Sequence, residues 1–93
     1  MATIILPKSG SFEIQQKLCW ETYKIELHQA TIEIIELRGE GFLLVDEEGK
    51  LKGFPINEEA TAMAVRAGAL FIGDFIVGNA IFLTNEEFET TID

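Results

Sequence analysis

The stretch from Phe54 to Gly68 constrains the fold most, because it encodes both ends of a helix. Asn57 is suited to the N-cap position, since its side-chain oxygen can accept the first unpaired backbone N–H groups. Pro55 prevents the helix from extending backward, and Gly68 suits the left-handed conformation that ends many helices. We therefore predict one well-capped helix over about residues 57–68.

This helix is predicted to pack on a β-sheet. Between Glu58 and Ala67, apolar residues follow the helical spacing i, i+3, i+4, i+7: Ala60, Met63, Ala64 and Ala67. Most of them are alanine, so the helix backbone can approach the surface beneath it closely. That surface is a sheet, because the segments on both sides of the helix read as strands. Glu58 and Glu59 lie in the first turn, where the helix dipole favours carboxylates.

The N-terminal part of the chain predicts a β-hairpin. Thr3–Leu6 is a β-rich run that ends at Pro7, and a turn-forming segment follows it. Phe12–Ile14 alternates apolar and polar residues, and we expect it to pair with the first strand.

Residues 15–30 fit two interpretations. In a helix, Trp20, Tyr23 and Leu27 would share one face, whereas in a strand Tyr23 and Leu27 would alternate with polar residues. The length of the segment and its lack of glycine favour a short helix before residue 31.

Further strands are predicted on both sides of residue 40. Ile32–Leu37 slips phase at Ile34 and Ile35, which indicates a bulge or burial on both faces. Phe42–Val45 is apolar on both faces, which predicts a central strand. Asp46–Gly49 is predicted to be a hairpin turn, with Lys50–Phe54 as the returning strand.

After the helix, apolar residues from Leu70 to Leu83 are interrupted by Gly73-Asp74 and Gly78-Asn79. This pattern predicts a sharply bent strand or two strands, buried on both faces. Residues 85–93 form an acidic tail without a clear element signal, and we expect the tail to be frayed.

Together these elements predict a single α+β domain over residues 1–93: a mostly antiparallel sheet of about five strands with the capped helix on one face. The net charge of −9 argues against direct binding to nucleic acid or to an anionic membrane, but it is compatible with a basic protein partner. A single cysteine and the lack of a signal sequence or membrane span predict a cytoplasmic protein. The apolar content of 47% leaves homo-oligomerisation open.

No catalytic constellation is evident. A catalytic thiol would require Cys19 beside His28, but a spacing of nine residues puts them on opposite faces of either a helix or a strand. One cysteine and one histidine cannot form a zinc site, and Asp46–Gly49 lacks the alternating ligands of a calcium loop. Glu58 and Glu59 are adjacent, so their carboxylates diverge.

Three further features have structural explanations. Arg38–Gly41 contains a G-x-G pattern, but no third glycine or helix follows to hold a phosphate. Asn79 is expected either to adopt a left-handed conformation or to donate to a buried backbone group. Trp20 and Tyr23 are expected to pack in the core rather than to form an exposed patch. We therefore predict no catalytic, cofactor-binding or metal-ligating residues.

The region from Ile32 to Leu83 resembles an uncharacterised family of small domains from phages, plasmids and bacterial genomes. The resemblance rests on Ile32–Ile35, Asp46–Leu51, Gly53–Asn57 and Asp74–Ala80. It implies a compact α+β domain and brings no activity, cofactor or site residues. The helix after Asn57 is longer and richer in alanine than we expect of that family.

The sequence thus favours a non-enzymatic accessory or interaction protein that acts on a protein partner through an acidic surface. One alternative is an inhibitor that mimics nucleic acid and occupies a DNA-binding protein, which would require acids along one continuous surface. A small enzyme or ligand-binding module is a further alternative, and it would require a pocket holding Cys19, His28 or Asn79.

Overall fold

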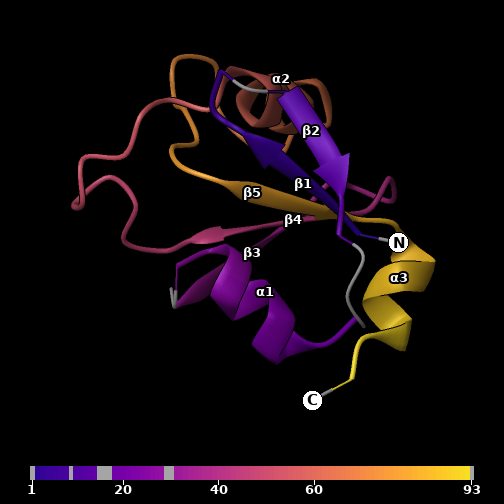
Figure 1. Cartoon of the computed structure of the whole chain (residues 1–93). Coiled ribbons are helices and arrows are strands. Elements are labelled where there is room, and N and C mark those ends of the chain that lie inside the picture. Colours follow the sequence, from indigo (N-terminus) through magenta and orange to yellow (C-terminus); the bar gives the residue numbers. More distant parts are fainter. Residues whose placement is uncertain (1, 9, 15–17, 29–30, 93) are drawn as a thin grey trace.

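A five-stranded antiparallel sheet with helices on both faces forms the protein, as a computed structural model shows (Figure 1). The structure describes residues 2–8, 10–14, 18–28 and 31–92. The strand order is β2-β1-β5-β4-β3. The elements are β1 (Thr3–Leu6), β2 (Gly10–Glu13), α1 (Trp20–Glu26), β3 (Ile32–Glu36), β4 (Phe42–Asp46), α2 (Glu58–Arg66), β5 (Ala80–Leu83) and α3 (Asn85–Thr90). The predicted α+β class is confirmed.

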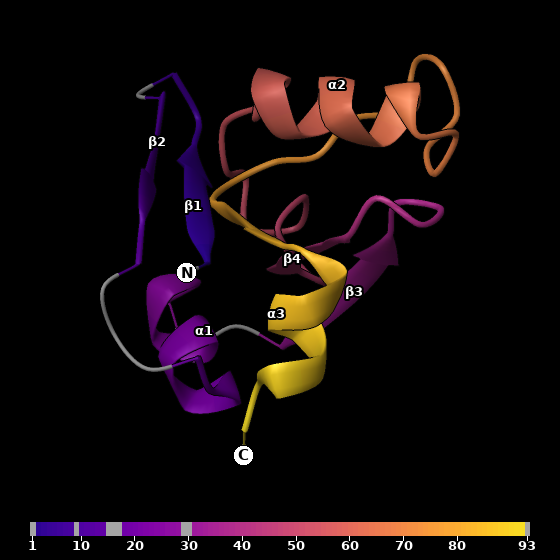
Figure 2. The same cartoon turned by 90° about the vertical axis from the view of Figure 1, so that its right-hand side faces the viewer.

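The sheet separates two apolar clusters, because successive residues of its strands point to opposite faces. On one face, Ile5, Leu43 and Ala80 pack against Ala60 and Ala64 of α2. On the other face, Ile4, Leu44 and Ile81 of the same strands pack against Tyr23 and Leu27. Trp20 and Phe88 lie at the border of this second cluster. Figure 2 shows α2 on one side of the sheet and α1 and α3 on the other.

The predicted helix caps are confirmed. The Asn57 side chain accepts a hydrogen bond from the Ala60 backbone N–H at 3.1 Å, and Gly68 follows the helix with a φ of +74°. The amide nitrogen of fully buried Asn57 also donates to the carbonyl oxygens of Ile5 and Gly78, each at 2.9 Å. One side chain therefore joins the start of α2 to β1 and to the turn before β5.

The helix predicted before residue 31 is also confirmed, as α1. Residues 15–17 and 29–30 lie outside the described part of the chain. Tyr23 and Leu27 are buried, and the Trp20 ring packs edge-on against Tyr23 and Phe88 at centroid distances of 5.5 and 5.8 Å. The expected core role of Trp20 and Tyr23 is confirmed.

Strand β3 differs from its prediction. It pairs residue for residue with β4, from Ile32 opposite Asp46 to Glu36 opposite Phe42, so it contains no bulge. It lies at the edge of the sheet, and Ile34 is 47% exposed, so the strand is not buried on both faces. The apolar–polar alternation is broken at Ile34 and Ile35 because the Ile34 side chain is apolar but lies partly in solvent at the sheet edge. The prediction that Phe42–Val45 is central is confirmed by β4.

Two other strand predictions are wrong. Lys50–Phe54 forms turns rather than a returning strand. The turns start at Asp46, whose carboxylate accepts the Glu48 N–H at 2.8 Å and pairs with the Lys52 Nζ at 2.7 Å. Of the described residues after α2, Ala80–Leu83 alone form a strand of the sheet.

The expectation of an acidic tail without a defined element is wrong for residues 85–90, which form α3. Thr84 and Glu87 form a capping box, in which the Thr84 hydroxyl accepts the Glu87 N–H and the Glu87 carboxylate accepts the Thr84 N–H. Phe88 stacks on Phe42 of β4 at 3.9 Å between ring centroids. The cap and this ring contact hold the helix on the sheet.

Candidate interaction surface

Among the strands that the described residues form, none pairs with the outer edge of β3. Within the antiparallel ladder, the Leu37 N–H donates to Gly41 and the Glu47 N–H donates to Thr31. Hydrogen-bonded and non-hydrogen-bonded residue pairs alternate along such a ladder. The backbone N–H and C=O groups of the odd-numbered residues of β3 therefore point toward β4. The backbone N–H and C=O groups of Ile32, Ile34 and Glu36 therefore point away from the sheet. An edge of this kind is a template for another strand.

A groove of about 730 Å³ follows this edge. Its lining combines residues from both faces of β3 with the segment that leaves α2: Glu33, Ile34, Ile35, Glu36, Arg38, Gly68, Ala69, Leu70 and Phe71. The groove thus lies between the outer side of β3 and the segment that leaves α2. An added strand at this edge would border it.

The 69–77 loop, which connects α2 to the turn before β5, presents apolar side chains beside the groove. Phe71 is 88% exposed and Ile72 is 92% exposed. An adjoining hollow of about 240 Å³ includes Leu51, Leu70 and Phe75 among its lining residues. Neighbouring apolar side chains this exposed are typical of a surface that is covered by a partner.

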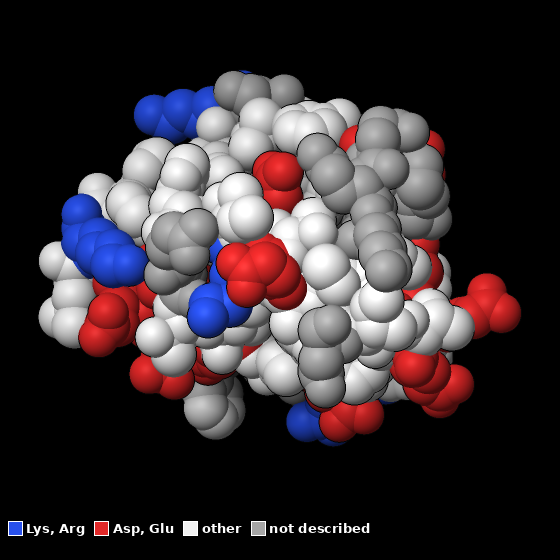
Figure 3. Space-filling model, turned by 60° about the horizontal axis from the view of Figure 1, so that its bottom comes forward, with Lys and Arg blue, Asp and Glu red and all other residues white. Residues whose placement is uncertain are grey.

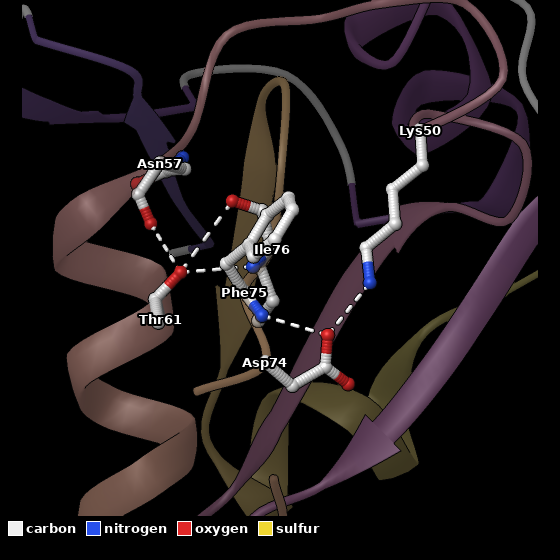
Figure 4. Close-up of polar contacts among 6 residues, drawn as sticks. All are labelled: Lys50, Asn57, Thr61, Asp74, Phe75 and Ile76. Atoms are coloured by element: carbon white, nitrogen blue, oxygen red, sulfur yellow. Dashed lines mark hydrogen bonds and ion pairs between the residues drawn. The ribbon is translucent and has the colours of Figure 1, made fainter. Parts of the chain in front are cut away.

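Hydrogen bonds fix the end of this loop against α2 (Figure 4). The Thr61 hydroxyl accepts the Ile76 N–H at 2.9 Å and donates to the Asn57 carbonyl oxygen at 2.8 Å. The Asn57 N–H in turn donates to the Ile76 carbonyl oxygen at 2.8 Å. The loop therefore starts and ends on α2, and its exposed apolar residues are presented from a fixed base.

A second contact ties the loop to the turns after β4. The Asp74 carboxylate accepts the Lys50 Nζ at 2.6 Å and the Phe75 N–H at 2.8 Å (Figure 4). The hydrogen bond from Lys50, with that from the Phe75 N–H, lowers the pKa of Asp74. The Lys50 ammonium also lies 4.6 Å from the centroid of the Phe75 ring, within the range of a cation–π contact.

Charges around the groove are mainly acidic. Glu33 and Glu36 are exposed on β3, and Glu47 lies in the turns after β4 beside the adjoining hollow. Arg38 lies at one end of the groove, and its side chain passes close to Gly68, where an added Cβ would lie 3.4 Å from the Arg38 Nε. On the face that Figure 3 brings forward, acidic side chains form separate groups with uncharged surface and basic side chains between them.

The residues considered for catalysis are only partly brought together. Cys19 is the N-cap residue of α1, with its Sγ 3.2 Å from the Thr22 hydroxyl, while His28 follows the other end of that helix. His28 instead approaches Asn79, with 3.5 Å between Nε2 and Nδ2. The Asn79 amide donates to the Glu26 carbonyl oxygen at 3.3 Å, as one of the two sequence interpretations expected.

His28 and Asn79 share a shallow hollow of about 290 Å³, which the sequence did not reveal. Its other lining residues are aliphatic, aromatic or glycine: Leu6, Pro7, Phe54, Pro55 and Gly78. The hollow thus places one imidazole and one amide on an apolar surface, and Cys19 is not among its lining residues. It offers neither a nucleophile nor a paired acid and base.

The other motifs have structural roles. Asn57 caps α2, with Glu58 and Glu59 exposed in its first turn, and Arg38–Gly41 connects β3 to β4. Within residues 2–8, 10–14, 18–28 and 31–92, no three His, Cys, Asp or Glu side chains converge as metal ligands would. In the same described ranges, no helix combines the length and apolar character needed to cross a bilayer.

Comparison with known proteins gives no match to a protein-family model, to a curated protein or to a solved structure.

Proposed function

We propose that this chain is a non-enzymatic interaction protein that binds a protein partner through the open edge of β3 and the 69–77 loop. The observation that carries this proposal is that a free strand edge and neighbouring exposed apolar residues border one groove. Main-chain hydrogen bonds to the edge would supply affinity, and the flanking side chains would supply specificity.

The distribution of acids on one face of the molecule favours this function over mimicry of nucleic acid. A mimic needs carboxylates along a continuous surface, whereas the face in Figure 3 carries them in separate groups. The acids that matter for the proposed function are those on β3, Glu33 and Glu36, because they line the groove.

Affinity capture from lysate of the cells that produce the protein tests the proposal with two matched variants. Ile34→Pro removes an outward N–H of β3 and places a ring where a partner strand would pair. Ser11→Pro does the same on β2 at the opposite edge, since the Ile14 N–H bond to Ala2 makes the Ser11 N–H point outward.

We expect the wild type and Ser11→Pro to capture the same protein and Ile34→Pro to lose it, while all three variants keep their circular-dichroism spectra. Equal capture by Ile34→Pro, or no specific capture at any salt concentration, would contradict the proposed function.

A further inference from the structure

We infer that the partner supplies an extended segment in which two adjacent apolar residues are flanked by basic residues, and that this segment adds to the sheet beside β3. The inference rests on the proposed function and specifies the chemistry of the partner at the same surface. It follows from the order of side chains along β3, the contents of the groove and the charge of the chain.

The backbone geometry selects an extended segment. The outward N–H and C=O groups of Ile32, Ile34 and Glu36 recur at every second residue, which is the spacing at which a neighbouring strand presents its own groups. The one-to-one register with β4 holds β3 straight, without a bulge that would turn the edge away. A strand can therefore form hydrogen bonds along the whole of β3.

The side chains of β3 select the composition of that strand. From Glu33 to Glu36 the order is acidic, apolar, apolar, acidic, and it reads the same in both directions. In a strand laid alongside, one residue stands opposite each of these four. Opposite charges and apolar pairs across strands are favourable, whereas like charges are not. The complementary order is basic–apolar–apolar–basic, whether the partner runs parallel or antiparallel.

The walls of the groove support this order. Ile35 faces the α2 side of the sheet and packs against the cluster that Leu70 borders, next to exposed Phe71. An apolar partner residue opposite Ile35 would be covered by these side chains. Arg38 follows the end of β3 and lines one end of the groove, so a further basic residue of the partner at that end would be repelled.

A second copy of the chain fits the edge less well. Antiparallel pairing through the outward groups and centred on Ile34 would place Glu33 opposite Ile35 of the second copy and Glu36 opposite its Ile32. Each carboxylate would then face an apolar side chain instead of a cation. Two chains of net charge −9 would also repel each other.

Two synthetic peptides of ten residues, acetylated and amidated, test the inference on the full chain. One contains Lys-Val-Val-Lys and the other Glu-Val-Val-Glu, both flanked by serine and threonine. Binding is followed by NMR shifts of the protein backbone amides. We expect shifts concentrated at Ile32, Ile34 and Glu36, and binding of the acidic peptide about tenfold weaker or more, because cross-strand charge pairs change from opposite to like.

A charge swap separates the proposed contact from general attraction between a basic peptide and an acidic protein. Glu33→Lys with Glu36→Lys should reverse the preference, so that the acidic peptide binds more tightly. Glu13→Lys with Glu21→Lys changes the net charge equally at exposed positions away from β3, and this control should keep the original preference.

Equal weakening by the two double variants, shifts concentrated on β2, or no preference between the peptides would overturn the inference. If capture from lysate still depends on Ile34 in those cases, the proposed function stands and only the partner chemistry is wrong. A doubling of the solution mass of the chain alone, lost in Ile34→Pro, would identify a second copy as the occupant and overturn the inference.

Discussion

The two ends of α2 differ in burial: the N-terminal end is buried and hydrogen-bonded, whereas the segment beyond the C-terminal end is exposed. At the N-terminal end, Asn57 is fully buried and its side chain and backbone hold β1, the turn at Gly78 and the 69–77 loop. Beyond the C-terminal end, that loop leaves the side chains of Phe71 and Ile72 almost entirely in solvent. The first region stabilises the fold, whereas the second adds exposed apolar surface that folding does not require. The proposed binding function would account for this difference.

The largest effect on stability is expected at the buried end. Asn57→Ala removes the helix cap and the buried amide that donates to the Ile5 and Gly78 carbonyl oxygens. Loss of a cap costs about 1 kcal/mol, and loss of these buried hydrogen bonds adds to this, so we expect a loss of about 3 kcal/mol in the free energy of unfolding. Urea denaturation measures the loss.

Asn85→Ala is the control for that change, because Asn85 is an exposed asparagine whose amide donates to the Gly39 carbonyl oxygen. It should change stability by no more than about 0.5 kcal/mol. Equal destabilisation by the two variants would contradict the role assigned to Asn57.

A smaller effect is expected where the two regions meet. Thr61→Val keeps the shape of the side chain but removes the acceptor of the Ile76 N–H. We expect a loss of about 1 kcal/mol in unfolding free energy and faster hydrogen exchange of the Ile76 amide. Thr90→Val, at an exposed position of α3, is the matched control. Unchanged exchange at Ile76 would show that Thr61 does not hold the loop.

At the exposed loop, stability and binding should separate. Phe71→Ser with Ile72→Ser removes little buried surface, so the free energy of unfolding should change by no more than about 0.5 kcal/mol. Capture of the partner should nevertheless fall. The same change at Ile25, exposed on α1, should leave capture intact. A large loss of stability in the double variant would mean that the loop is part of the core.

The smallest effect concerns pH. The hydrogen bond from Lys50 lowers the pKa of Asp74, and a depressed pKa in the folded state means that this contact stabilises the fold above the carboxyl's ordinary pKa. The contribution is lost as pH falls through the lowered pKa. An NMR titration should show Asp74 titrating below an ordinary aspartate, together with a shift of the Phe75 amide. Lys50→Met should raise the Asp74 pKa toward its ordinary value, while the hydrogen bond from the Phe75 N–H remains. An ordinary pKa in the wild type would contradict the contact.

The same comparison explains what the sequence could predict. The N-cap of α2 is a local interaction, because Asn57 accepts a hydrogen bond from a residue three positions away. The sequence therefore predicts this helix almost to its ends. Helix α3 carries an equally local signal, Thr84 followed three residues later by Glu87, which the acidic composition obscured. Cys19 and His28 flank the two ends of α1, so the length of the helix separates them rather than its faces.

The candidate interaction surface could not be predicted in the same way. Strand order depends on distant pairings, and no local pattern shows that Ile32–Glu36 ends at an edge while Phe42–Asp46 lies inside. Apolar content predicts burial, so Phe71 and Ile72 were placed in a buried strand. The approach of His28 to Asn79 likewise arises from packing between segments far apart in the chain.

Hydrogen exchange of the β3 amides, measured with and without the captured partner, tests whether the partner binds at the β3 edge. We expect the N–H groups of Ile32, Ile34 and Glu36 to exchange fast in the chain alone and to slow strongly in the complex, while Ser11 on β2 stays fast. Slowing on β2 with no change at these three amides would contradict the assignment of the β3 edge as the binding surface.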